Sequence, residues 1–335
     1  MREKLKTDKF MKRQLRLLFL LILCMSNSGY AQNLMPEIYT KGGGFDPDKI
    51  KTYKHTDALR LEFFMFYPED FKQGDTRPAV LFFFGGGWKG GHANQFYPQS
   101  AYLKSRGIIA ICANYRTEKD GALPYTCVQD AKSAVRFIRE NAKAIGVNPN
   151  KLAVGGGSAG GHLAAATATI KKFDSEEDNL SFSAVPNALV LFNPVYDNGP
   201  NGYGYERVQG YYKDFSPIDN LQGKLPPTIV FMGDNDKHTP VTTTVLYEKR
   251  MKANGNRCET YIYENQKHGF FNLHNTKEST YFIDTVEKMD AFLVSLGYLS
   301  GPSTVKDWFA VQEKRLILVE PKKKKKNKKH KVKQQ

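Results

Sequence analysis

The feature that most constrains this chain is a short apolar segment that runs into closely spaced glycines with one serine among them. It reads KLAVGGGSAGGHLAAA and covers residues 151–166. Residues 156–160 fit the pattern G-x-S-x-G, in which a sharp strand-to-helix turn pushes the serine hydroxyl, here that of Ser158, out of the backbone. Glycines flank the serine because a Cβ would clash in so tight a turn. The pattern predicts a strand at 151–155, a helix at 159–170 and a nucleophilic serine between them.

A second group of glycines follows another apolar segment, in LFFFGGGWKGG at residues 81–91. Attack of a serine on an acyl carbon creates an oxyanion, and that charge needs N–H donors held in place beforehand. One donor can come from Ala159, the residue after the serine, and others from a glycine loop after an earlier strand. The glycines at 85–87 suit this task because no side chain hinders the approach of a substrate.

The rest of the chain alternates between apolar segments and segments of helical period. We expect strands at 59–67, 78–85, 108–114, 188–194, 227–233 and 258–264, and helices at 126–144, 241–254 and 276–297. Continuous apolar strands that alternate with helices indicate an α/β protein with a parallel sheet covered on both faces. The Gly-, Tyr- and Asn-rich segment at 195–225 has neither period. It is either a lid or binding segment or a plain surface excursion.

A serine nucleophile needs a base, and the base needs an orienting acid. In an open parallel sheet these groups collect beyond the carboxyl ends of the strands. Asp234 and Asp236 follow the strand expected at 227–233, and His268 follows the last one. Position alone does not decide between the two aspartates. Three other titratable residues are expected to be structural: His162 and His238 as packing or supporting groups, and Asp130 as a helix-start residue that complements the helix dipole.

Four motifs in order make the chain resemble the α/β-hydrolases of the esterase and acetyl-esterase type, which include hormone-sensitive-lipase-like and bacterial feruloyl and acetylxylan esterases. They are FFFGGGW, GGGSAGGHLA, PPTIVFMGDNDKHTPV and NQKHGF, within residues 50–297. The resemblance implies an α/β-hydrolase fold, with a mostly parallel central sheet and helices on both faces, in a catalytic domain at 32–300. The sequence differs from the family at Phe84, where the family has a histidine before the glycines. That change bears on the rigidity of the loop rather than on its backbone donors.

The same resemblance implies the roles of the site residues. Ser158 would be the nucleophile, His268 the general base and acid, and Asp236 its orienter. Gly86, Gly87 and Ala159 would supply the oxyanion N–H groups. Apart from the resemblance, the place of Trp88 in the glycine loop suggests that it lines the acyl pocket, although a core position is the commoner one for tryptophan. No metal or cofactor is expected.

The resemblance implies a serine esterase that acts through an acyl-enzyme on acetyl or feruloyl esters of plant polysaccharide. There are two alternatives: a peptidase of the prolyl oligopeptidase-like kind and a non-catalytic homologue that binds polyanions. The first usually carries a large extra N-terminal domain. Intact Ser158, Asp236 and His268 argue against the second.

The net charge of +15 belongs mainly to the two ends of the 335-residue chain. Residues 1–31 carry +5 and residues 321–335 carry +9, which leaves +1 for the body. This distribution argues against a nucleic-acid-binding domain, whose basic patch would lie on the folded face.

The first 31 residues have the pattern of a secretory signal. Basic residues precede an apolar segment at 17–25, and small residues follow, so cleavage is expected after Ala31. A lipoprotein anchor on Cys24 is the weaker alternative because Leu23, not a small residue, precedes it. The chain is therefore expected to be secreted or periplasmic. After cleavage the chain keeps three cysteines, Cys112, Cys127 and Cys258, which are expected to be small buried side chains. One disulfide between two of them is the alternative in an oxidising compartment.

The lysine-rich segment at 321–335 follows a C-terminal extension at 301–320 and is expected to be disordered. We predict that a chain ending at Glu320 keeps full kcat on a small neutral ester but loses salt-sensitive retention on an anionic matrix, because nine lysines are removed. Retention should weaken between 0.1 and 1 M salt as the Debye length falls from about 10 to about 3 Å. Impaired turnover would make the tail part of the active enzyme, and unchanged retention would mean that the tail binds no polyanion.

Overall fold

The computed structural model describes residues 45–57, 59–273 and 279–319. The chain divides into two compact units, Met1–Asp46 and Pro47–Gln335. Only Phe45 and Asp46 of the first unit are described, so the fold reported below is that of the second unit. The predicted signal segment at 1–31, Cys24 and the lysine-rich tail lie outside the described residues, and the boundaries predicted for them stay predictions.

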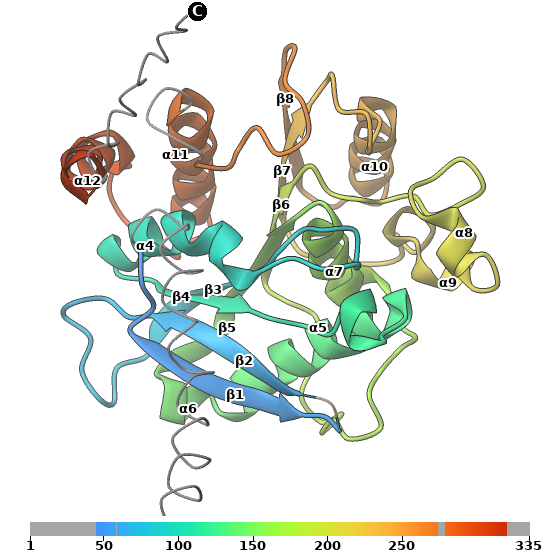
Figure 1. Cartoon of the computed structure of the whole chain (residues 1–335), viewed down its shortest axis with the longest axis horizontal. Helices are drawn as coiled ribbons and strands as arrows, with labels where there is room; N and C mark the ends of the chain where they lie inside the picture. The colour runs from blue at the N-terminus through green and yellow to red at the C-terminus, as the bar shows by residue number, and fades with distance from the viewer. Residues whose placement is uncertain (1–44, 58, 274–278, 320–335) are drawn as a thin grey trace, which may run out of the picture. The chain divides into compact units, whose positions relative to one another are not determined.

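Within the described residues, eight strands form one sheet in the order β1-β2-β4-β3-β5-β6-β7-β8 (Figure 1). Two pairings are antiparallel, β1 with β2 and β2 with β4, and the others are parallel. This confirms the predicted mostly parallel sheet. The strands are β1 Lys49–His55, β2 Arg60–Phe66, β3 Arg77–Phe83, β4 Ile109–Ala113, β5 Val147–Gly157, β6 Ala188–Phe192, β7 Thr228–Gly233 and β8 Cys258–Tyr263.

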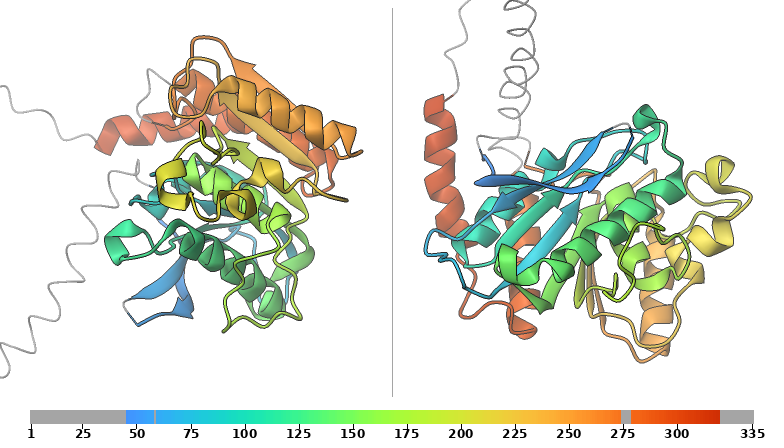
Figure 2. Two further views of the ribbon diagram at one scale, coloured as in Figure 1. Left: turned by 90° about the vertical axis from the view of Figure 1, so that its right-hand side faces the viewer. Right: turned by 90° about the horizontal axis from the view of Figure 1, so that it is seen from below.

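Helices cover both faces of the sheet. On one face lie α4 (Tyr97–Ser105) and α11 (Ser279–Ser295), and on the other α5 (Pro124–Glu140), α7 (Ala159–Thr169) and α10 (Val241–Ala253) (Figures 1 and 2). The central strands β4, β6 and β7 are buried at every residue. Their apolar sequences reflect this two-sided burial, and they form the core on which the site is built.

The remaining helical elements are short, except the last. They are η3 Ala93–Phe96, η4 Glu118–Asp120, α6 Ala142–Ile145, α8 Tyr205–Val208, α9 Tyr212–Phe215, η5 Pro217–Asp219 and α12 Val305–Val319. The segment predicted only as an extension at 301–320 therefore contains a helix. Inside it, Phe309 packs against Phe282 of α11, with ring centroids 6.1 Å apart.

Sequence patterns missed β1 and α4 for different reasons. β1 reads KIKTYKH and buries only Tyr53 and Lys54, so it has the lysine-rich character of a protected edge strand rather than an apolar run. α4 buries polar side chains, those of Gln99 and Ser100, together with its apolar ones, so it shows no distinct apolar stripe.

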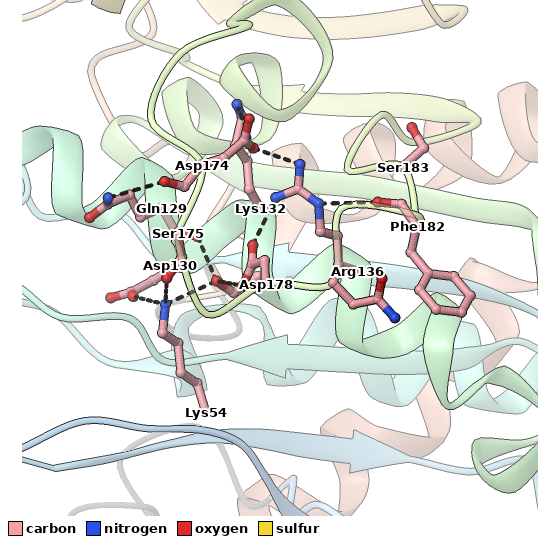
Figure 3. Close-up of polar contacts among 12 residues, drawn as sticks. Lys54, Gln129, Asp130, Lys132, Arg136, Asp174, Ser175, Asp178, Phe182 and Ser183 are labelled. Atoms are coloured by element: carbon pink, nitrogen blue, oxygen red, sulfur yellow. Dashed lines mark hydrogen bonds and ion pairs between the residues drawn. The ribbon is translucent and has the colours of Figure 1, made fainter.

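Asp130 is not the dipole-complementing residue expected at the start of a helix. It lies in the second turn of α5, fully buried, and accepts hydrogen bonds from Arg116 at 2.6 and 2.9 Å. The ammonium of Lys54 in β1 lies 3.7 Å from the same carboxylate (Figure 3). Burial of a carboxylate requires such partners, so Asp130 holds β1 and the segment after β4 against α5.

α5 also anchors the long connection between α7 and β6. Arg136 contacts Asp174 at 2.6 Å and Asp178 at 2.7 Å and donates to the carbonyl of Phe182 (Figure 3). Lys132 donates to the carbonyl of Lys172. These charge-assisted contacts fix a connection that has few apolar residues to bury.

The described cysteines, Cys112, Cys127 and Cys258, are buried and free, so the disulfide left open by the sequence does not form among them. Burial raises the pKa of the Cys112 thiol to about 12, which fits the predicted structural role of a buried cysteine. In the described part of the chain, every helix is too short or too polar to span a lipid bilayer.

Gly160 offers a test of how tightly α7 packs on the sheet. A Cβ at this position would lie 2.1 Å from the carbonyl oxygen of Phe83 and 2.4 Å from that of Phe84. In an open helix, replacement of glycine by alanine stabilises by roughly 0.5–1 kcal/mol. Here the backbone clash dominates, so we predict that Gly160→Ala destabilises the fold by about 1–3 kcal/mol or more.

The matched control is Gly210→Ala, where no heavy atom lies within 4 Å of the added carbon. It should leave stability unchanged or slightly raised. Urea and thermal unfolding of both variants would check this pair, and equal stability of the two would contradict the packing seen at α7.

Candidate active site

Ser158 stands at the turn between β5 and α7, as predicted. Its backbone has φ 54° and ψ −119°, a strained conformation for a residue with a side chain that costs about 1–3 kcal/mol. Three backbone hydrogen bonds hold the turn: the Ser158 amide donates to the Phe192 carbonyl, and its own carbonyl accepts from His162 and Val195. The surrounding structure thus imposes a conformation that lifts the serine side chain out of the chain path.

The glycine loop lies directly beside this turn. β3 and β5 are parallel neighbours with Phe83 opposite Gly156, so the segments that follow them emerge side by side. A Cβ on Gly85 would lie 3.2 Å from the Ser158 Cβ. Gly86 has φ 127° and Gly87 φ 63°, which favour glycine, and a Cβ on Gly86 would lie 1.8 Å from the carbonyl oxygen of Gly90.

The amides of Gly86 and Gly87 are free to bind a substrate. In the part of the chain that the structure describes, neither donates a hydrogen bond. The amide of Ala159 lies in the first turn of α7, where helix N–H groups lack an intrahelical acceptor. These are the three donors that the sequence predicted for an oxyanion. Their catalytic role stays a prediction.

The glycine loop is well supported although Phe84 stands where the family has a histidine. The Phe84 ring stacks on Tyr115 at 4.2 Å, and the Tyr115 hydroxyl donates to the Phe84 carbonyl at 2.8 Å. Further along the loop, the Gly85 amide donates to the Gln95 side chain at 2.7 Å and the Trp88 carbonyl accepts from the Glu118 amide at 2.9 Å. Aromatic stacking and hydrogen bonds therefore take the place of a histidine at position 84.

Asp236 and His268 form a hydrogen-bonded pair beyond the ends of β7 and β8. Asp236 Oδ2 lies 2.6 Å from His268 Nδ1, and the carboxylate side chain is fully buried. It also accepts from the amides of His238 and Thr239, the Thr239 hydroxyl and the Asn193 side chain. Asp234, the alternative acid, is exposed. Of the two aspartates, the structure therefore pairs Asp236 with the histidine.

The electrostatics of the pair define which histidine nitrogen carries the proton. Burial raises the pKa of Asp236, but the hydrogen bond and charge of His268 and the donors from His238 and Asn193 outweigh it, so its pKa lies well below the usual range. An ionised carboxylate only accepts hydrogen bonds, so Nδ1 of His268 is the donor and Nε2 is left as the basic nitrogen.

The loop that carries His268 packs against the serine turn. A Cβ on Gly157 would lie 2.7 Å from the ring of Phe271, which also packs on Phe192 with centroids 4.7 Å apart. Gln95 ties the histidine loop to the glycine loop, because its amide nitrogen donates to Asn272 at 3.1 Å while its oxygen accepts from Gly85. The predicted site segments thus meet at one end of the sheet.

The irregular segment at 195–225 packs over the glycine loop. Its Arg207 donates to the Gly87 carbonyl at 2.7 Å and lies 5.2 Å above the Trp88 ring. Trp88 is 1% exposed and packs on His162 and Phe215. The substrate contact predicted for Trp88 stays a prediction, and the structure shows its ring as part of the packing beneath this segment.

The two other histidines also lie near the site. His162 is fully buried, and its Nε2 is 2.9 Å from the Phe215 carbonyl. Burial lowers the pKa of His162 to about 3, which keeps the ring neutral and fits the predicted packing role. The His238 ring lies 5.0 Å from that of His268, beside the acid as expected.

Four residues of the site were not predicted from the sequence: Gln95, Asn193, Tyr203 and Arg207. Asn193 follows the end of β6 with φ 40° and donates to Asp236 at 2.6 Å. Its place after a strand of the parallel sheet is a signal that could have identified it. The others act through contacts between distant segments, which no local motif reports.

Comparison with solved structures identifies the family. The chain is 39% identical to the propionate-bound esterase 2 of Thermogutta terrifontis, with a TM-score of 0.72, and the match covers 76% of this chain and 96% of that one. The chain belongs to the α/β-hydrolase esterases. The BD-FAE family model matches residues 65–197 of this family member, and the dienelactone hydrolase family model matches residues 203–293.

Among curated relatives of this α/β-hydrolase, the acetylxylan esterase of Xylanibacter ruminicola is 27% identical over 236 residues, which are 65% of this chain and 45% of that protein. A probable isoprenylcysteine alpha-carbonyl methylesterase of Arabidopsis thaliana is 26% identical over 266 residues, which are 71% of this chain and 55% of that protein. The chain thus spans about half the length of these two relatives. The fold and the family resemblance expected from the motifs are confirmed.

The buried pair predicts different roles for the two aspartates. We expect Asp236→Asn to lower kcat for ester hydrolysis by about 10⁴-fold, because an amide that donates to His268 selects the wrong imidazole tautomer. Asp234→Asn should change kcat less than about twofold, a small effect for a surface position away from the reacting groups. Steady-state kinetics on one aryl ester would measure both, with circular dichroism as a check on folding. The reverse ranking would assign the acid to Asp234.

Proposed function

We propose that this chain is a serine esterase that hydrolyses carboxylic esters through Ser158, His268 and Asp236. The observation that carries the proposal is the buried Asp236–His268 hydrogen bond at the sheet end where Ser158 occupies a strained turn. The chain order Ser, Asp, His is that of the nucleophile-elbow hydrolases. The three relatives compared above are named esterases, which supports the same activity class.

We infer the following reaction for these residues. His268 Nε2 removes the proton from the Ser158 hydroxyl as the serine oxygen attacks the ester carbonyl carbon, whose π electrons move to the carbonyl oxygen. The free amides of Gly86, Gly87 and Ala159 stabilise that oxyanion. As the carbonyl re-forms, the bond to the alcohol breaks, and His268 gives its proton to the leaving oxygen. Asp236 stays ionised and stabilises the imidazolium that exists between the two proton transfers.

Hydrolysis of the acyl-enzyme completes the cycle, with water as the nucleophile and the serine oxygen as the leaving group. The water loses a proton to His268 Nε2 and attacks the acyl-enzyme, and the proton then returns to the serine oxygen as the acid leaves. Every step uses side chains and backbone groups of this chain, and no metal or cofactor takes part in this proposal.

For the substrate, we propose short acyl or feruloyl esters carried by plant polysaccharide. The acetylxylan esterase relative and the BD-FAE family model support a carbohydrate ester. The solved relative was obtained with propionate and with butyrate bound, which supports a small acyl group. The signal pattern at 1–31 supports secretion to a compartment where polymer fragments occur.

Replacement of the nucleophile tests the activity. We predict that Ser158→Ala lowers kcat on p-nitrophenyl acetate by about 10⁶-fold, the usual loss for a triad nucleophile. The exposed Ser183→Ala is the matched control and should keep full activity. Residual turnover above a few per cent in pure Ser158→Ala protein would exclude this serine as the nucleophile.

The substrate class needs a panel of esters. Hydrolysis should be fastest on acetyl and propionyl aryl esters, acetylated xylan oligomers or methyl ferulate, and slow on octanoyl esters. A preference for a proline-containing peptide amide would favour the peptidase alternative. Absence of turnover on every ester would favour the non-catalytic alternative.

A further inference from the structure

Tyr203 belongs to the segment at 195–225 and lies over the glycine loop. A Cβ built on Gly87 would lie 2.5 Å from the Tyr203 hydroxyl oxygen and 3.5 Å or more from its ring carbons. The tip of the phenol therefore points at the second of the two loop residues whose amides are free. Gly87 can approach this closely only because it has no side chain.

The same side chain also lies near the histidine side of the site. The Tyr203 ring is 6.3 Å from the His238 ring, which in turn lies 5.0 Å from that of His268. Tyr203 thus lies between the glycine loop and the loop after β7 that carries Asp236 and His238. Its side chain is part-exposed, and within the described residues its hydroxyl makes no hydrogen bond, so it has a free donor at this place.

The backbone of Tyr203 is firmly held. Its amide donates to the Asp197 carbonyl at 3.0 Å, and its carbonyl accepts from the Asn198 side chain at 2.8 Å. Gly202, just before it, has no room for a Cβ because the Asp197 carbonyl oxygen would lie 2.4 Å away. A donor on so constrained a turn needs little reorganisation to act, which is the requirement for stabilising charge that develops during a reaction.

Arg207 connects this turn to the glycine loop. It donates to the Gly87 carbonyl at 2.7 Å, and its guanidinium lies 6.0 Å from the Tyr203 ring and 5.2 Å from the Trp88 ring. Arg207 is therefore a common neighbour of the Gly87 backbone and the Tyr203 ring.

From these contacts we propose that Tyr203 is a further catalytic residue, whose hydroxyl donates a hydrogen bond to the carbonyl oxygen of the ester as negative charge builds on it. It would act beside the amides of Gly86, Gly87 and Ala159. This inference rests on the proposed serine esterase function. A hydrogen bond that is strongest to the oxyanion lowers the barrier and therefore affects kcat more than KM.

Tyr203→Phe tests the proposal because it removes one oxygen atom and keeps the ring. With p-nitrophenyl acetate we expect kcat to fall by about 100-fold, the lower end for loss of one oxyanion donor, while KM changes less than about threefold. Tyr205→Phe is the matched control, since its ring packs on Tyr212 at 5.5 Å, and it should keep the wild-type kcat. Thermal unfolding should be the same for both variants and the wild-type protein.

A second measurement uses phenylboronic acid, which forms a tetrahedral adduct with an active-site serine. Its inhibition constant should rise for Tyr203→Phe by about the factor by which kcat falls, because both report the tetrahedral state. An unchanged kcat, or a raised KM with kcat intact, would overturn the role of the hydroxyl while wild-type turnover still supports the esterase. Wild-type protein that neither hydrolyses the ester nor binds the boronic acid would overturn the proposed function and this inference together.

Discussion

The site depends on one constraint, the close approach of the turn around Ser158 to the ends of strands β3 and β6. A serine with φ 54° is unfavourable by itself and persists because neighbours on both sides hold it. Its amide is bonded to Phe192 at the end of β6, while Gly156 and Gly160 pack within contact of the Phe83 carbonyl at the end of β3. Any side chain at either glycine would push the turn off the sheet, and the serine would lose its position.

Parallel strand order brings the other parts to the same place. Because β3, β5, β6, β7 and β8 are neighbours in that order and run the same way, whatever follows each strand emerges at one edge. The glycine loop, Ser158, Asn193, Asp236 and His268 follow these five strands in turn. Hydrogen bonds of single side chains then connect these segments. The main one is Gln95, which bonds the glycine loop on one side and the histidine loop on the other.

The segment between β6 and β7 also packs against this group of loops. It could have been a plain excursion, but Arg207 bonds the Gly87 carbonyl and Tyr203 points at the same glycine. Rigidity that a histidine at position 84 would have given to the loop comes instead from Arg207, Tyr115 and Gln95. The proposed site therefore combines a strained turn at Ser158 with a glycine loop supported from several separate segments, which is the condition for preorganised charge stabilisation.

Local sequence determined the elements whose signals are local. Continuous apolar runs identified the buried strands, and G-x-S-x-G identified the turn at Ser158, because hydrophobic burial and the steric demands of a tight turn act over a few residues. The choice of Asp236 over Asp234 needed the tertiary structure, since both follow β7 and only the fold shows which one is buried against His268. The same holds for Asp130, which pairs with Arg116 and Lys54, and for Tyr203 and Arg207, whose contacts with Gly87 span more than a hundred residues of sequence. Such contacts depend on how strands are ordered in the sheet, and strand order is a property of the whole fold rather than of any short stretch of sequence.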